Sequence, residues 1–98
     1  MTANAHPVFE VRLRSRRVQR ELDRLQRADY ERVIARLRAL ADNPRGRGCE
    51  KLYDAIYRIR VGDFRIVYLV DDENKRIEVG AIRRRGETTY RGIDELFG

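Results

Sequence analysis

The stretch YRIRVGDFRIVY, residues 57–68, decides how the rest of the chain is interpreted. Apolar and polar side chains alternate with a period of two on both sides of Gly62-Asp63, which is typical of two half-buried β-strands. Gly62-Asp63 is a turn signal, although its order is the reverse of the favoured Asp-Gly. The stretch therefore predicts a tight β-hairpin, and the alternation of its second strand continues to Val70.

Downstream of the hairpin, the period of two returns once more. The acidic turn Asp71–Asn74 leads into Ile77–Ala81, which we expect to form a further strand. The run Arg83–Gly86 ends the regular pattern, and Ile93–Phe97 favours a short closing helix. The hairpin is thus predicted to extend into a meander of three strands.

Upstream of the hairpin, the pattern changes to helical spacing. We expect a first strand over Val8–Leu13, a helix after the N-cap Ser15, and a second helix capped by Asp29 and ended by Asn43-Pro44. The apolar stripes of these helices are Val18, Leu22 and Leu25, and then Val33, Ile34, Leu37, Leu40 and Ala41.

The order of these elements predicts an α+β fold. It consists of an N-terminal strand, a helical hairpin and a three-stranded antiparallel meander, with the helices packed on one face of the sheet.

The composition is that of a small compact protein. The chain has 98 residues, enough for one domain, with 42% apolar and 39% charged residues. No apolar run approaches the length of a membrane span, and the basic N-terminus lacks the apolar stretch of a signal peptide. We therefore expect a single domain over residues 1–98, a cytoplasmic location and no membrane partner.

Several kinds of catalytic site are absent from the sequence. Cys49 is the only cysteine and His6 the only histidine, so there is no Cys/His metal spacing and no disulfide within the monomer. There is also no Ser-His-Asp order and no phosphate-cradling glycine loop. We expect no metal and no cofactor, so any chemistry must come from arginine, tyrosine and carboxylate side chains.

Arginine dominates the charge. The formal net charge is +6, and of 22 basic residues only Lys51 and Lys75 are lysines. Guanidinium groups grip phosphate bidentately, so the bias favours a nucleic-acid partner. Genome composition produces the same bias, and charge by itself does not identify the partner.

The predicted hairpin carries a first cluster of arginines. Arg58 and Arg60 are two apart on one strand, so their side chains leave the same face. Arg65 lies just past the turn, and its face depends on the register of the hairpin. The cluster is either the solvated outer face of a half-buried sheet or a cradle for a phosphodiester.

A second basic cluster follows the last strand. It combines arginines with one aromatic ring: Arg83, Arg84, Arg85, Tyr90 and Arg91. Unstacked RNA bases commonly lie against tyrosine rings or arginine planes. A run of three arginines is also compatible with an ordinary charged loop.

In this order, the motifs resemble the RelE/ParE toxin superfamily. The hairpin of residues 57–68 is similar to the superfamily's central signature, and Leu40–Pro44 and Lys51-Leu52 match its helix end and the start of its sheet. The arginine-rich strand end followed by Tyr90 is similar to the RelE branch in particular. The resemblance covers residues 8–93.

The resemblance implies a helical hairpin on a four-stranded antiparallel sheet. It also implies a toxin that cleaves mRNA in the ribosomal A site without metal, by attack of the 2′-hydroxyl on the adjacent phosphate. Position by position, Arg58 and Arg60 match two basic residues of one strand, and Arg65 matches the phosphate-holding arginine of the next. Arg84 matches the arginine six residues before the terminal tyrosine, and Tyr90 matches that tyrosine.

The remaining basic residues of the second cluster are expected to bind RNA: Arg83, Arg85 and Arg91. The partners implied are the mRNA, the 70S ribosome and a cognate antitoxin, in a hetero-oligomer that binds operator DNA through the antitoxin. Two alternatives remain: a non-catalytic toxin of the ParE type that inhibits DNA gyrase, and an RNA-binding relative without toxicity.

The chain departs from the family pattern at two positions. The best-known ribosome-dependent members have lysines where this chain has Arg58 and Arg60. A crowded lysine can lose its proton and act as a base, whereas arginine stays protonated. Stabilisation of the transition state by charged forks survives the change. We therefore expect a slower enzyme or one that relies on electrostatics and on the geometry of the ribosome.

Overall fold

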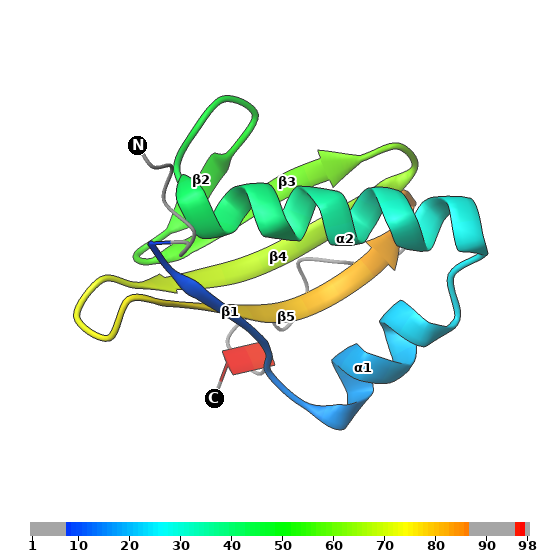
Figure 1. The fold of residues 1–98 in the computed structure, drawn as a ribbon, viewed down its shortest axis with the longest axis horizontal. Helices are drawn as coiled ribbons and strands as arrows, with labels where there is room; N and C mark the ends of the chain where they lie inside the picture. The colour runs from blue at the N-terminus through cyan, green and yellow to red at the C-terminus, as the bar shows by residue number, and fades with distance from the viewer. Residues whose placement is uncertain (1–7, 87–95, 98) are drawn as a thin grey trace, which may run out of the picture.

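The computed structural model of the chain describes residues 8–86 and 96–97. Seven helices and strands follow one another in these residues: β1 (Glu10–Leu13), α1 (Arg16–Asp23), α2 (Arg27–Asp42), β2 (Glu50–Tyr53), β3 (Ile56–Val61), β4 (Phe64–Asp71) and β5 (Arg76–Arg84). The strands form one sheet in the order β1-β5-β4-β3-β2, and both helices lie on one side of it (Figure 1). The predicted α+β fold, with its helices on one sheet face, is confirmed.

The sheet differs from the expected four-stranded antiparallel one in two respects. It has a fifth strand, β2, and β1 runs parallel to β5 with Glu10 opposite Arg76. Both differences have a physical reason. The sequence of β2, EKLY, buries little and gives almost no alternation, and the pairing of β1 with β5 joins segments more than sixty residues apart in the chain.

The helices begin close to their predicted positions. Ser15 is the N-cap of α1 in an extended conformation, without a side-chain hydrogen bond to the helix. The prediction that Asp29 caps α2 is wrong, because Gln26 holds the N-cap position and Asp29 lies in the first turn. There the carboxylate of Asp29 pairs with Arg32 and complements the positive end of the helix dipole.

The main core lies between the helices and the sheet. It is a cluster of buried side chains from all layers: Phe9, Val18, Leu22, Val33, Leu37, Leu40, Ile59, Ile66, Tyr68, Val70, Ile77, Val79 and Ile82. Tyr68 is fully buried, and its hydroxyl donates a 2.7 Å hydrogen bond to the carbonyl of Pro44. Burial raises the pKa of this hydroxyl well above its usual range. The bond therefore ties the segment that follows α2 to the centre of the sheet.

The other face of the sheet carries a smaller apolar cluster. Ile56, Val67, Ala81 and Leu96 are buried there, with Phe97 packed against them. Of the closing helix expected over residues 93–97, residues 93–95 lie outside the described part of the chain, and Leu96 and Phe97 are helical. Within the described ranges, none of the helices combines the length and the apolar character that a membrane crossing requires.

Two irregularities set which way the strands face. Gly62 has φ +58° at the first central position of the β3–β4 turn, as a type II′ turn requires, which explains why Gly-Asp serves in place of Asp-Gly. Val67 of β4 opposes Ala81 of β5, whereas Tyr68 opposes Val79, so Gly80 is the extra residue of a β-bulge in β5. The bulge puts Ala81 on the face away from the helices, although the expected alternation places it with Val79.

Candidate nucleic-acid interface

Three arginines occupy neighbouring positions on three strands. Arg60 of β3 is directly opposite Arg65 of β4, and Arg65 is directly opposite Arg83 of β5. Residues opposite one another project from the same face of a sheet, so these Cβ atoms share the face away from the helices. Strand spacing makes the row about 10 Å wide. We call Arg60, Arg65 and Arg83 the arginine row.

The register of the β3–β4 hairpin puts Arg65 on the same face as Arg60, which the sequence did not determine. Among the described residues, neither side chain has an ion-pair or hydrogen-bond partner. Like charges directly opposite each other on a sheet are destabilising. An uncompensated pair of this kind is chemically suited to an anion that bridges both guanidinium groups.

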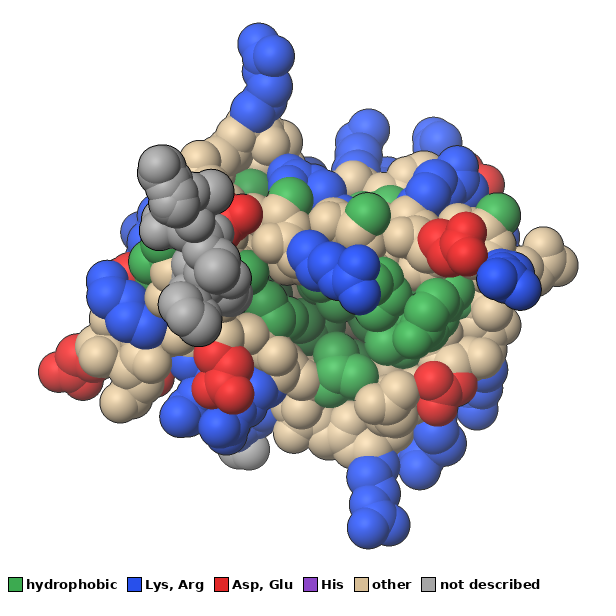
Figure 2. Space-filling view, viewed as in Figure 1, with side chains coloured by type: hydrophobic (Ala, Val, Ile, Leu, Met, Phe, Trp, Pro, Cys, Tyr) green, Lys and Arg blue, Asp and Glu red, His purple; other side chains and the backbone are tan. Residues whose placement is uncertain are grey.

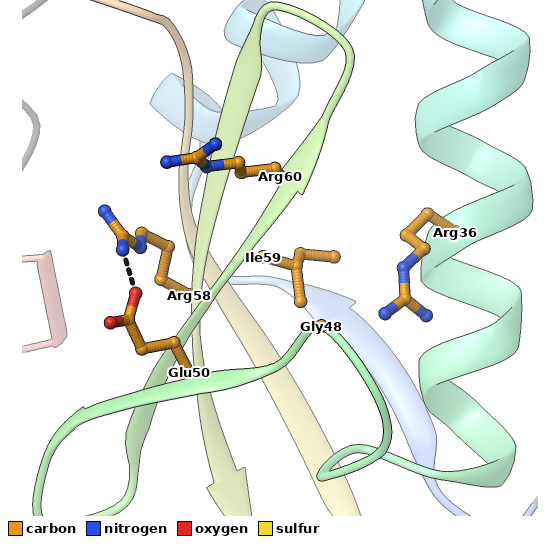
Figure 3. A pocket seen from close by; sticks show the side chains of 6 residues that line it. All are labelled: Arg36, Gly48, Glu50, Arg58, Ile59 and Arg60. Atoms are coloured by element: carbon orange, nitrogen blue, oxygen red, sulfur yellow. Dashed lines mark hydrogen bonds and ion pairs between the residues drawn. The ribbon is translucent and has the colours of Figure 1, made fainter.

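Arg58 lies one position along the same face from Arg60. Its register partner on β2 is Glu50, and the two side chains form an ion pair (Figure 3). The ion pair partly neutralises Arg58, whereas Arg60 has no such partner among the described residues. β2, the strand that was not predicted from the sequence, thus contributes the carboxylate of Glu50 to the site.

A polar pocket of about 300 Å³ opens beside β3. It is lined by Arg36, Gly48, Glu50, Arg58, Ile59 and Arg60. Figure 3 shows Arg58 and Arg60 on one side of β3 and Arg36, from α2, on the other side with Ile59 between them. Arg36 donates a 3.0 Å hydrogen bond to the carbonyl of Arg47, which fixes it over the pocket.

Arg36 was not predicted from the sequence as part of this pocket. The only signal was its place on α2 beside the apolar residues Val33 and Leu37, which marks a position at the edge of the buried face.

The arginines at the end of β5 diverge. Arg84 is opposite Phe64, and its guanidinium carbon lies 4.9 Å from the centre of that ring, a cation–π contact. Arg84 therefore projects from the sheet face that packs against the helices, and not from the face that carries the arginine row. Arg83 takes the place beside Arg65, and its Nε is 3.3 Å from a carboxylate oxygen of Glu21.

Of the other predicted RNA-binding residues, Arg85 is exposed past the end of β5. Its backbone N–H donates a 2.6 Å hydrogen bond to the carbonyl of Asp63 and so extends the pairing of β4 and β5. Tyr90 and Arg91 lie outside the described residues. Within the described ranges, no three His, Cys, Asp or Glu side chains gather in a group that could hold a metal ion.

A second contact network supports the opposite end of the sheet. Arg45 donates hydrogen bonds of 3.1 and 2.6 Å to the carboxylate of Asp72 and one of 2.9 Å to the Tyr57 hydroxyl. The contact with Arg45 holds the pKa of Asp72 below its usual range. Tyr57 in turn stacks on Tyr68, with ring centres 5.8 Å apart. The network fastens the β4–β5 turn to the loop after α2.

The face of the helices has a different character. An apolar groove of about 450 Å³ runs between β1, α1 and α2, lined by Phe9, Glu10, Val11, Leu13, Leu22, Ile34, Leu37, Arg38 and Ala41. Figure 2, viewed from the helix side, shows apolar side chains gathered in a hollow with basic side chains around it. This lining has little that would bind phosphate, so the arginine row is the better candidate for nucleic acid.

The arrangement of the row can perform one kind of chemistry well. Fixed guanidinium forks hold a phosphodiester and stabilise negative charge that develops on its oxygens. None of the four residues Arg58, Arg60, Arg65 and Arg83 is suited to removing a proton, because arginine stays charged.

Comparison with known proteins gives one family. Residues 13–89 match the model of the family described as ParE toxin of type II toxin–antitoxin system, parDE. No functionally curated protein matches the chain in sequence.

Solved structures share the fold. In the archaeal RelE–RelB complex from Pyrococcus horikoshii, the matching chain is 27% identical with a TM-score of 0.74, covering 83% of this chain and 99% of that chain. A mutant of E. coli RelE in the free state is 19% identical, with a TM-score of 0.72 and coverage of 92% and 90%. A RelBE toxin–antitoxin complex from Mycobacterium tuberculosis is 23% identical, with a TM-score of 0.70 and coverage of 82% and 100%.

The hairpin signature, the fold and the family match agree with one another. The chain belongs to the ParE toxin family of type II toxin–antitoxin systems, within the RelE/ParE superfamily, and has the fold of its RelE-like branch.

Proposed function

We propose that this toxin is a ribosome-dependent, metal-independent endoribonuclease that cleaves mRNA in the A site. The observation that carries the proposal is the opposed pair Arg60 and Arg65, which has no partner among the described residues, with Arg83 beside it. A protein that only contacts another protein has no need to keep like charges opposed on one sheet face, whereas a phosphodiester pairs with both.

The reaction is an attack of the ribose 2′-oxygen on the adjacent phosphorus. The new bond from the 2′-oxygen to phosphorus closes a 2′,3′-cyclic phosphate, and the bond from phosphorus to the 5′-oxygen breaks. The leaving 5′-oxygen takes a proton from water and becomes a 5′-hydroxyl. Arg60 and Arg65 hold the non-bridging oxygens and stabilise the charge that develops there. Arg58 supports Arg60, Arg83 holds a phosphate beside Arg65, and Tyr90 orients the nucleotide.

No described residue of the site is suited to removing the proton of the 2′-hydroxyl. The proposal therefore assigns proton removal to water or to the ribosome, which also aligns the 2′-oxygen for attack. The ribosome is needed because the arginine row stabilises charge on the phosphate but does little to align the 2′-oxygen for attack.

The partner of the free toxin is a cognate antitoxin. The solved relatives from P. horikoshii and M. tuberculosis are complexes with their antitoxins. By this analogy the toxin forms a hetero-oligomer that binds operator DNA through the antitoxin, and the antitoxin restrains the toxin until it is removed.

The description of the matching family favours a second candidate, inhibition of DNA gyrase by a toxin of the ParE type. Pulse labelling after induction separates the two. Under our proposal, amino-acid incorporation falls first. Early loss of thymidine incorporation together with an SOS response would replace the nuclease by the gyrase inhibitor.

Ribosome dependence is tested with purified protein. We expect cleavage of mRNA on programmed ribosomes, little cleavage of the same RNA free in solution, and no effect of EDTA under conditions that keep ribosomes intact. The double variant Arg60→Ala/Arg65→Ala is the control for contaminating nucleases. Rapid cleavage of the free RNA by the wild type, absent in the double variant, would contradict the ribosome-dependent part.

A further inference from the structure

Glu21 of α1 contacts the site from outside the sheet. One carboxylate oxygen accepts a 2.9 Å hydrogen bond from the backbone N–H of Ile82, and the other lies 3.3 Å from Nε of Arg83. The second oxygen also accepts a 2.9 Å bond from Arg17, one helical turn earlier. The carboxylate is therefore engaged on both oxygens, and the side chain of Glu21 is only 15% exposed.

The end of β1 creates the need for these contacts. Pairing of β1 with β5 stops at Leu13 and Val79, so no described strand pairs with the backbone of β5 beyond Val79 on that side. Arg17 donates a 2.7 Å hydrogen bond to the carbonyl of Gly80, and Glu21 accepts from Ile82. Two side chains of α1 thus replace a neighbouring strand and satisfy backbone groups that would otherwise lack partners.

Arg83 is the only member of the arginine row that has an ion-pair partner within the described ranges. Glu21 binds the inner nitrogen, Nε, whereas the two terminal nitrogens of Arg83 make no hydrogen bond to any described residue. A guanidinium held at Nε keeps its terminal fork in a defined orientation, and a terminal fork is the part that grips phosphate.

We infer that Glu21 is a positioning residue: it orients Arg83 so that its terminal nitrogens are ready for a backbone phosphate of the RNA. The inference rests on the proposed nuclease function. It gives α1 a role in the site, although α1 lies on the opposite side of the sheet from the row.

An effect of Glu21 through its charge alone and an effect through positioning of Arg83 predict opposite results when the carboxylate is removed. Removing a carboxylate next to an RNA-binding surface increases the positive potential and should tighten RNA binding. Loss of positioning should slow the cleavage step, because misplacing a reacting group by about 1 Å costs on the order of 100-fold in rate.

The decisive variant is Glu21→Gln, measured by single-turnover cleavage on programmed ribosomes over a range of toxin concentrations. Its amide oxygen can still accept from Ile82, but its charge is gone. We expect the maximal rate to fall by roughly tenfold or more, with little change in the half-saturating concentration. Glu31→Gln is the matched control, since Glu31 forms an equivalent pair with Arg27 on α2.

Dependence on Arg83 distinguishes positioning from general damage. In an Arg83→Ala background, Glu21→Gln should have no further effect on the rate. Gln19→Ala should leave the rate nearly unchanged, because it removes the exposed contact of Gln19 with Asp23 on the same helix and leaves Glu21 beside Arg83. By NMR, the Nε–H signal of Arg83 should be protected from exchange in the wild type and unprotected in Glu21→Gln.

Two results would overturn the inference: unchanged or faster cleavage by Glu21→Gln, or an equal loss of rate with and without Arg83. If Glu21→Gln is too unstable to purify, Arg83→Lys tests the same contact, because lysine keeps the charge but has no Nε; a wild-type rate would refute the inference. If the double variant Arg60→Ala/Arg65→Ala also cleaves normally, the nuclease proposal itself has failed.

Discussion

Arg60 and Arg65 face each other across the two-residue turn of β3 and β4, and no described carboxylate lies between them. An opposed pair of like charges on one face of a sheet is destabilising. The hairpin is otherwise well built, with Ile59 and Ile66 buried next to the pair. The repulsion between these two side chains thus lies at the position where a bound phosphate would relieve it.

Truncating one member of this pair should separate stability from activity. We expect Arg65→Ala to unfold at the same or a slightly higher denaturant concentration, since the repulsion is relieved. Its cleavage rate on programmed ribosomes should fall by about 10²–10³, the usual loss for one preorganised donor. Arg38→Ala, an exposed arginine of α2 that lines the apolar groove, is the control. Equal rates for the two variants would remove Arg65 from the mechanism.

The two arginines at the end of β5 can be ranked by experiment. The register puts Arg83 beside Arg65, whereas Arg84 lies over the ring of Phe64. We expect Arg83→Ala to slow cleavage more than Arg84→Ala, and Arg84→Ala to cost more stability through its lost cation–π contact. Single-turnover rates and denaturant titrations on both variants decide this. A larger rate loss for Arg84→Ala would favour the role that the family resemblance gives to that residue.

Arg60→Lys asks whether the site lacks a base or depends on a fork. A lysine crowded by cations can titrate, so a missing base predicts an equal or faster rate and a pH profile shifted toward neutrality. A bidentate fork predicts a slower rate, since a point charge cannot replace both hydrogen bonds. We expect the slower rate, to be checked by single-turnover measurements across pH with Arg60→Ala alongside. Wild-type activity in Arg60→Ala would exclude the residue altogether.

Acid should loosen the end of the sheet opposite the turn of β3 and β4. Arg45 holds the pKa of Asp72 below the ordinary value of about 4. A depressed pKa contributes stability that is present above the unfolded-state value and is lost as the pH falls through the folded-state value. Asp72→Asn should therefore be less stable than the wild type at neutral pH, and the difference should shrink below about pH 4. Parallel unfolding curves at every pH would refute this contribution.

The sequence predicted the hairpin well because its information is local. Alternation over residues 57–68 and a turn at Gly62 define the faces of β3 and β4 without reference to the rest of the chain. It did not predict that β1 joins β5 in parallel, since this pairing is between distant segments and leaves no local pattern. Arg36 was missed for the same reason: only the packing of α2 against β3 brings it to the pocket.

The choice between Arg83 and Arg84 could not be made from the sequence, since it depends on the bulge at Gly80. Uninterrupted alternation from Val79 would turn Arg83 toward the helices and Arg84 toward Arg65. The extra residue reverses this. Glycine lets the ring of Phe97 pack against this backbone, because a Cβ at Gly80 would lie 2.5 Å from Cζ of Phe97 and the ring would have to shift. This contact comes from the far end of the chain.

The bulge at Gly80 shifts the alternation of side chains in β5 by one residue. Residues before Gly80 and residues after it are in different phases with respect to the sheet. Pairing Gly80 as an ordinary strand residue would exchange every inward and outward side chain from Ala81 to Arg84, whereas deleting Gly80 would leave those side chains on their present faces. A relative of the same length that pairs this strand without the bulge would therefore place the position of Arg84, and not that of Arg83, beside Arg65. In this strand, two residues that align in sequence can therefore lie on different faces of the sheet.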